Sequence, residues 1–136
     1  MTKNELDKLS YKILGCCIEV HKALGPGLLE SVYHKCLIEE FRYQKIQFQS
    51  QLIVPVYYRG TEVLAELRAD FFVENSIVLE LKAVETILPI HEAQILTYLK
   101  LLDAPKGLLV NFNSTNIFKY GQKSFVTEKY RVLDED

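Results

Sequence analysis

A short, almost wholly apolar run at 108–112 limits the possible folds of this chain more than any other segment. Such a run is typical of a β-strand buried on both faces, which requires helices on both sides of its sheet. It follows a predicted helix, 90–102, which Pro89 opens and the sequence 103–107 ends. Because a helix between strands carries the chain across the sheet, we expect a parallel or mixed arrangement of strands.

Hydrophobic spacing predicts the other elements. Apolar residues at steps of three and four predict one amphipathic helix over 6–24 and a second over 28–41, separated by Gly25-Pro26-Gly27. Pro55 lacks an amide donor, so the strand that contains it should lie at a sheet edge or carry a bulge. β-branched and aromatic residues predict four strands besides the apolar run, followed by a frayed C-terminal tail: 49–58, 63–73, 77–84 and 117–126.

The expected fold class is therefore α/β (α+β), a mixed β-sheet flanked by helices in the order α-α-β-β-β-α-β-β. The chain has 136 residues, of which 49% are hydrophobic and 25% charged, so we expect one domain over 1–136. The sequence has no run of about 18 apolar residues, so we expect no membrane span, and 1–10 lacks the apolar region of a signal peptide. Three cysteines without C-x-x-C spacing suit core positions and a reducing, cytoplasmic location.

The charged residues in and near 77–84 are the most informative for function. Glu80 and Lys82 share one face of a strand whose other positions are apolar, and a turn at 74–76 places Asp70 opposite Glu80. One interpretation is a strip of charges that faces solvent. The other is a metal site, because charges within an apolar strand must be paired or bind a metal, and Mg²⁺ prefers oxygen ligands. The net charge of −2 excludes a wholly basic surface but not such a local site.

Asp70 and the sequence Glu80-Leu81-Lys82 resemble the D…(D/E)-x-K signature of the PD-(D/E)XK nuclease superfamily. The segment 27–33, GLLESVY, is similar to the pattern that names the GxxExxY family, a branch of that superfamily. The resemblance covers about 8–113. It implies a restriction-endonuclease-like α-β-β-β-α-β core, here with an extra N-terminal helix and a C-terminal strand.

The resemblance also implies a metal site. Glu30, Asp70 and Glu80 match its carboxylates, and the backbone carbonyl of Leu81 is a further ligand. Lys82 matches the lysine that positions the attacking water or neutralises charge on the phosphate. Glu30 has a second interpretation, because the helix dipole favours a carboxylate in the first turn of any helix.

Three further residues match functional positions of RecB-like nucleases. Gln94 and Tyr98 reproduce a Q-x-x-x-Y motif and share one helix face, from which they would contact the nucleic-acid backbone. A polar edge is, however, common on any amphipathic helix. His21 matches a histidine that binds metal in some of these enzymes, although a histidine at a helix C-terminus also interacts favourably with the helix dipole.

The resemblance implies a nuclease that depends on Mg²⁺ or Mn²⁺ and cleaves phosphodiester bonds in nucleic acid, with DNA favoured over RNA. An alternative from another class is a catalytically inactive module of nuclease fold that binds nucleic acid or a protein partner. A hydrolase for a small phosphate compound is less favoured, because no Gly-rich phosphate loop is present. A homodimer would double the basic surface available to a nucleic acid.

Overall fold

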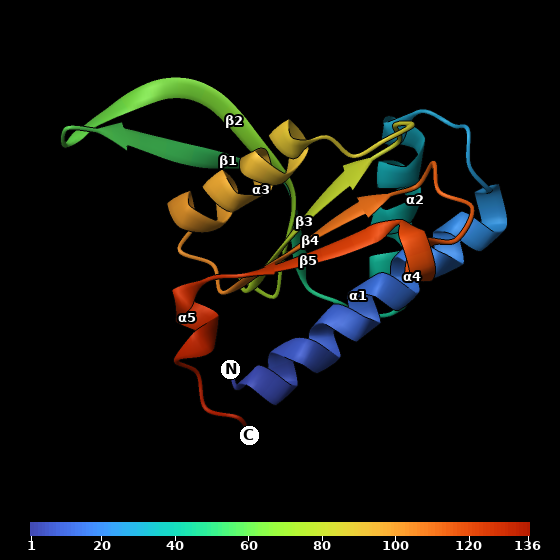
Figure 1. Cartoon of the computed structure of the whole chain (residues 1–136), viewed down its shortest axis with the longest axis horizontal. Coiled ribbons are helices and arrows are strands. Elements are labelled where there is room, and N and C mark those ends of the chain that lie inside the picture. The colour runs from blue at the N-terminus through green and yellow to red at the C-terminus, as the bar shows by residue number, and fades with distance from the viewer.

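The protein contains a five-stranded sheet with helices on both faces (Figure 1). A computed structural model describes all 136 residues. The elements, in chain order, are α1 Lys3–Leu24, α2 Glu30–Tyr43, β1 Phe48–Tyr58, β2 Thr61–Val73, β3 Ile77–Lys82, α3 Pro89–Leu101, β4 Lys106–Asn111, α4 Ile117–Tyr120, β5 Gln122–Val126 and α5 Glu128–Arg131.

The strand order follows the chain, β1-β2-β3-β4-β5, and only the β3–β4 pair is parallel. The α3 helix connects these two strands, as the crossover rule requires. Every residue of β4 is buried, which confirms the prediction made from the apolar run. The predicted mixed, helix-flanked sheet is therefore confirmed.

Two hydrophobic cores hold the layers together. On one face of the sheet, α1 and α2 pack their apolar sides against strand residues that include Leu79, Leu81 and Val110. On the other face, α3 packs Ile95 and Leu99 against residues that include Val78 and Leu109. The alternation of β3 and β4 residues between the cores explains why both strands are apolar on both faces. Cys16 and Cys17 are buried in the first core, and Cys36 packs against it, as predicted.

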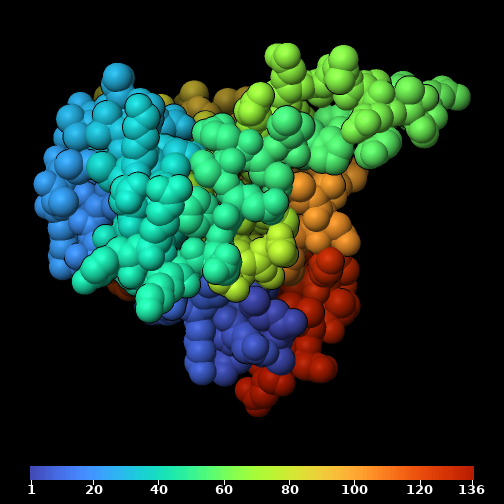
Figure 2. Space-filling view, turned by 180° about the vertical axis from the view of Figure 1, so that it is seen from behind, coloured from blue at the N-terminus to red at the C-terminus, as the bar shows by residue number.

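The β1–β2 hairpin extends beyond the rest of the molecule as an arm (Figures 1 and 2). The arm comprises 55–66, and its outer residues are exposed; Leu64 is fully so. β1 is an edge strand, and its pairing with β2 shifts register between Val54 and Val56, on either side of Pro55. The predicted edge position and bulge are both confirmed, because a proline cannot donate a hydrogen bond to the ladder.

One predicted strand is wrong in its first half. The sequence 117–126 was expected to form a single strand, but α4 occupies Ile117–Tyr120 and only Gln122–Val126 forms β5. The Asn116 side chain caps α4 by accepting a hydrogen bond from the Lys119 amide at 3.0 Å. At Gly121 a Cβ atom would lie 2.9 Å from the Asn111 carbonyl oxygen, so this close approach requires glycine.

The C-terminal residues are not the frayed tail that the sequence suggested. After α5, the Asp134 and Glu135 carbonyls accept hydrogen bonds from the Lys3 and Asn4 amides at 2.8 and 3.0 Å. These amides belong to the first turn of α1, where helical donors have no partner within the helix. The last residues therefore dock on α1 because they supply acceptors to these donors.

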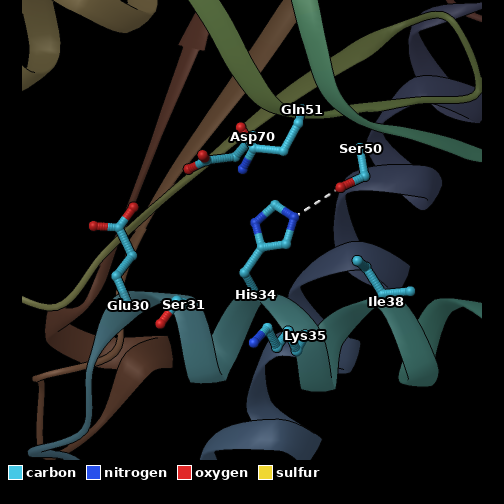
Figure 3. Close-up of a pocket in the computed structure, with 8 residues that line it drawn as sticks. All are labelled: Glu30, Ser31, His34, Lys35, Ile38, Ser50, Gln51 and Asp70. Atoms are coloured by element: carbon cyan, nitrogen blue, oxygen red, sulfur yellow. Dashed lines mark hydrogen bonds between the residues drawn. The ribbon is translucent and has the colours of Figure 1, made fainter.

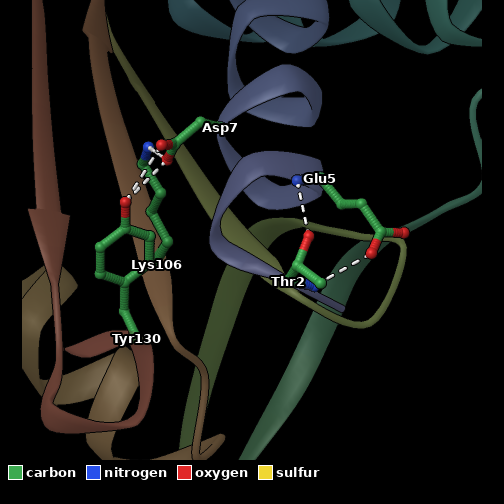
Figure 4. A network of polar contacts seen from close by, with 5 residues as sticks. All are labelled: Thr2, Glu5, Asp7, Lys106 and Tyr130. Atoms are coloured by element: carbon green, nitrogen blue, oxygen red, sulfur yellow. Dashed lines mark hydrogen bonds and ion pairs between the residues drawn. The ribbon is translucent and has the colours of Figure 1, made fainter. Parts of the chain in front are cut away.

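A partly buried polar network fixes the same end of the molecule (Figure 4). The Lys106 ammonium on β4 lies 3.0 Å from an Asp7 carboxylate oxygen on α1. The Tyr130 hydroxyl of α5 donates to the same carboxylate at 3.0 Å. Lys106 is only 9% exposed, so Asp7 supplies the partner that its buried charge requires. The structure contains no helix with both the length and the apolar character needed to cross a membrane.

Candidate functional site

The antiparallel β2–β3 ladder sets the position of the predicted acidic pair. It joins Val73 to Ile77, Phe72 to Val78 and Phe71 to Leu79, so the next step places Asp70 opposite Glu80. At that step the strands are joined by hydrogen bonds from backbone amides to the Asp70 and Glu80 carboxylates, in place of backbone-to-backbone hydrogen bonds. The Asp70 amide donates to Glu80 Oε2 at 2.6 Å, and the Leu81 amide donates to Asp70 Oδ2 at 2.8 Å. The two carboxylates are therefore held side by side, at the register that the turn length predicts.

Asp70 also marks an irregularity in β2. The β1–β2 ladder joins Ser50 to Phe71 and Leu52 to Ala69 but omits the step between them. At that step Gln51 of β1 has a left-handed φ of 52°, which is unusual for a residue other than glycine. Phe71 packs in the core of α1 and α2, whereas Ala69 packs in the core of α3. In a regular strand, side chains two residues apart lie on the same face of the sheet. Phe71 and Ala69 lie on opposite faces, so the alternation of β2 side chains is interrupted at Asp70.

Burial makes the acidic pair electrostatically unfavourable. Glu80 is 4% exposed, and burial together with the nearby charge of Asp70 raises its pKa from the ordinary 4.5 to about 8. Burial likewise raises the pKa of Asp70. The second oxygen of each carboxylate accepts no hydrogen bond within the chain and is not sealed from solvent. The pair thus consists of two acids that have no ion-pair partner and that each keep one oxygen free to accept a hydrogen bond or bind a cation.

Lys82 lies two residues beyond Glu80, at the end of β3, and is half-buried. Its ammonium has no carboxylate within 4.0 Å. Its carbonyl accepts a hydrogen bond from the Phe112 amide at 2.8 Å, which anchors the end of the strand. The charge of Lys82 opposes the upward pKa shifts of Glu30, Asp70 and Glu80, so it lies within electrostatic reach of all three.

Glu30 is the first residue of α2 and lines a cavity together with Asp70 (Figure 3). Burial, followed by the charge of Asp70, raises the pKa of Glu30. The cavity lies between α2 and β1 and has a volume of about 560 Å³; we call it the α2 cavity. Seven of its eight lining residues are polar: Glu30, Ser31, His34, Lys35, Ser50, Gln51 and Asp70.

His34 is a residue of this region that sequence reasoning did not assign to the site. It is only 9% exposed and lines the α2 cavity. Its Nε2 lies 2.8 Å from Ser50 Oγ, and its ring stacks on Phe71 with centroids 4.2 Å apart. Burial lowers the pKa of His34, which favours the neutral ring. Its spacing of four residues from Glu30, one helical turn, was the available signal.

The two residues of the Q-x-x-x-Y motif lie one turn apart on α3, which packs on the sheet face opposite α1 and α2. Tyr98 is buried, and burial together with the charges of Glu80 and Asp70 raises its pKa. Gln94 is exposed and lines a second cavity of about 490 Å³ together with Lys82; we call it the α3 cavity. The structure therefore brings both residues near the acidic pair, on the side opposite the α2 cavity.

His21 and the side chain of Leu81 lie outside the two cavities. His21 lies in the last turn of α1, with its ring centroid 6.3 Å from that of Phe112, and its buried Nε2 has no hydrogen-bond partner. It lines neither the α2 nor the α3 cavity. The Leu81 side chain is fully buried in the first core, and its amide holds Asp70.

The acids of this region carry oxygen atoms of the kind that hard metal ions bind. No three His, Cys, Asp or Glu side chains stand close enough together to hold a metal ion. Asp70 and Glu80 nevertheless offer a pair of carboxylates with free oxygens. Mg²⁺ commonly binds through one or two carboxylates and keeps several waters. The pair therefore fits a hard divalent cation, with Glu30 as a nearby third acid.

Comparison with known proteins adds one positive finding. A family model described as the PD-(D/E)XK nuclease superfamily matches residues 7–124. No curated protein and no solved structure matches the chain.

Proposed function

Because the chain belongs to the PD-(D/E)XK nuclease superfamily, we propose that it hydrolyses phosphodiester bonds, in DNA rather than RNA, at the Asp70–Glu80 pair. The observation that carries the proposal is the cross-strand arrangement of the two acids. Each holds the backbone of the opposite strand while keeping a second oxygen free. Burial of Glu80 and partial burial of Asp70 make ionisation of the pair costly, which is more typical of a functional site than of a pair that stabilises the fold.

PD-(D/E)XK nucleases generally use divalent metal ions, and we propose Mg²⁺ or Mn²⁺ here. Asp70 and Glu80 would hold the ion, with Glu30, the Leu81 carbonyl and His21 as further candidate ligands. When bound, such an ion polarises the phosphate and lowers the pKa of a water molecule. The match of 27–33 to the GxxExxY pattern is consistent with that branch of the superfamily.

Lys82 would act next to the ion. Its ammonium has no ion-pair partner within the chain, so it is free to hold the attacking water or to neutralise charge on the phosphate. Gln94 and Tyr98 would contact the nucleic-acid backbone from the α3 side, because Gln94 shares a cavity with Lys82. The Tyr98 hydroxyl would remain protonated, since its pKa is raised.

The test is cleavage of labelled DNA in Mn²⁺ or Mg²⁺, with a Glu80→Gln variant as the control. The glutamine keeps an oxygen that can accept the Asp70 hydrogen bond, so the variant removes the charge but not the link. We expect cleavage by the parent protein and none by the variant. If neither cleaves any single-stranded, duplex or branched DNA, the proposal fails and an inactive binding module is favoured.

A further inference from the structure

Two cavities flank the acidic pair on opposite sides. Asp70 lines the α2 cavity of about 560 Å³, and Lys82 lines the α3 cavity of about 490 Å³. Asp70 and Glu80 lie between them, joined by the hydrogen bonds across β2 and β3. The reacting phosphate would therefore have one cavity on each side of it, and the contents of these cavities would determine the substrate.

The α2 cavity is rich in hydrogen-bond donors. Ser31 and Lys35 lie one turn apart on α2, and Gln51 reaches the cavity from β1 (Figure 3). Lys35 is exposed and forms no ion pair within the chain, so its charge is available to a ligand. Hydroxyl, ammonium and amide groups of this kind bind phosphate and sugar oxygens.

Polar and aromatic contacts join the elements that form the wall of the α2 cavity. The hydrogen bond between His34 and Ser50 ties α2 to β1, and the stacking of His34 on Phe71 fixes the ring. Gln51 adopts its left-handed backbone at this wall. Backbone strain of this kind is often found at binding sites, where the surrounding structure holds it in place.

The size and charge of the cavities favour a single strand over a duplex. Each volume lies within the range of about 300–1,000 Å³ that is usual for small-molecule sites, so each can hold about one nucleotide. Lys35 and Lys82 are the only lysines or arginines that line them. The two cavities can therefore neutralise only about two phosphates, far fewer than the roughly 6–10 phosphate contacts that make duplex binding strong and steeply salt-dependent.

We propose that the substrate is a single nucleic-acid strand that crosses the Asp70–Glu80 pair with one nucleotide in each cavity. Lys35 binds the phosphate on the α2 side. This inference rests on the proposed function, because it takes the acidic pair as the reacting centre. It adds the substrate class and a binding residue, Lys35, that the D…(D/E)-x-K pattern does not include.

The test measures binding without cleavage. Glu80→Gln protein is titrated against a fluorescein-labelled 12-nucleotide single strand and against a blunt duplex of the same sequence, using fluorescence anisotropy in Mg²⁺. We expect the single strand to bind at least about ten-fold more tightly than the duplex. Adding Lys35→Ala should weaken single-strand binding about five-fold or more and reduce the log–log salt slope by about 0.7.

Lys12→Ala provides a matched control. Lys12 is exposed on α1, forms no ion pair and lines neither cavity, so its removal should leave both affinities unchanged. Equal or tighter binding of the duplex would overturn the inference. So would equal effects of the Lys35→Ala and Lys12→Ala substitutions.

Cleavage by the parent protein separates the two proposals. If it cuts duplex as fast as single strands, the proposed function holds and the single-strand inference is wrong. If it cuts neither, while Glu80→Gln protein still binds single strands through Lys35, the nuclease proposal fails, and with it the role of the strand as a substrate; only the binding of a single strand through Lys35 is retained.

Discussion

Asp70 and Glu80 each hold the strand on which the other lies. Glu80 accepts a hydrogen bond from the Asp70 amide at 2.6 Å, and Asp70 accepts one from the Leu81 amide at 2.8 Å. The acids therefore continue the β2–β3 pairing beyond the point where the backbone ladder ends at Phe71 and Leu79. Amide variants of either acid keep an acceptor oxygen, so they separate the electrostatic role of the pair from its structural role.

The first prediction concerns pH and stability. Between its ordinary pKa of 4.5 and the value of about 8 in the fold, Glu80 is protonated when folded and ionised when unfolded. The free energy of unfolding of the metal-free protein should therefore decrease as pH rises through this range. In Glu80→Gln protein this decrease should largely disappear, giving an advantage of at least about 2 kcal/mol over the parent near pH 9.

Urea denaturation at several pH values with a chelator present measures this effect. Glu62→Gln is the control, because Glu62 is an exposed acid on β2 within the arm. Its pH profile should match that of the parent. An identical profile for Glu80→Gln would show that burial does not raise the pKa of Glu80.

The second prediction concerns metal binding. A divalent cation competes with the proton held by the pair, so Mn²⁺ should bind about ten-fold more weakly near pH 7 than near pH 9. Isothermal titration calorimetry should detect proton release as a dependence of the heat on the buffer. Asp70→Asn should abolish binding, while Glu30→Gln should weaken it less. Equal binding by Asp70→Asn and the parent would exclude a site at the pair.

The third prediction separates binding from reaction at Lys82. Lys82 has no ion-pair partner, so Lys82→Ala should fold normally and keep the Mn²⁺-induced rise in melting temperature. Its cleavage rate should fall at least about 100-fold, because a group that stabilises developing charge is lost. Lys100→Ala, an exposed lysine on α3, should cut at the parental rate. Parental cleavage by Lys82→Ala would assign the reaction to other groups.

The fourth prediction concerns stability far from the site. Asp7→Ala leaves the buried Lys106 ammonium without its partner, so it should destabilise the fold by about 2 kcal/mol. Adding Lys106→Met should recover most of that loss, because no uncompensated charge remains. Cleavage should be unchanged in both proteins at a temperature where they are folded. Lys106 pairs with Ile77 at one end of the β3–β4 ladder, whereas Lys82 is at the other end.

Local sequence rules were sufficient to predict much of the fold and the position of Asp70 opposite Glu80. The short turn at 74–76 fixed the β2–β3 register, and Pro55 fixed both the edge position and the bulge of β1. These features depend on residues close together in the sequence, which a single chain reveals.

Features that depend on distant contacts were not predictable. The change of face at Asp70 coincides with the unusual backbone of Gln51, nineteen residues earlier in the chain. The position of His34 depends on Ser50 and Phe71, which lie on two different strands. The docking of the tail depends on amides at the opposite end of the chain.

That docking has a consequence for how the chain can be rearranged. Because Lys3 and Asn4 are hydrogen-bonded to Asp134 and Glu135, the path of the backbone almost closes into a ring. A short linker joining these ends, with a new opening at the exposed turn around Gly60, would leave α2, α3 and the inner parts of β2 and β3 uninterrupted. The site would then be encoded in a permuted order, with Asp70 and Glu80 in the first part of the chain and Glu30 after them, in its last quarter.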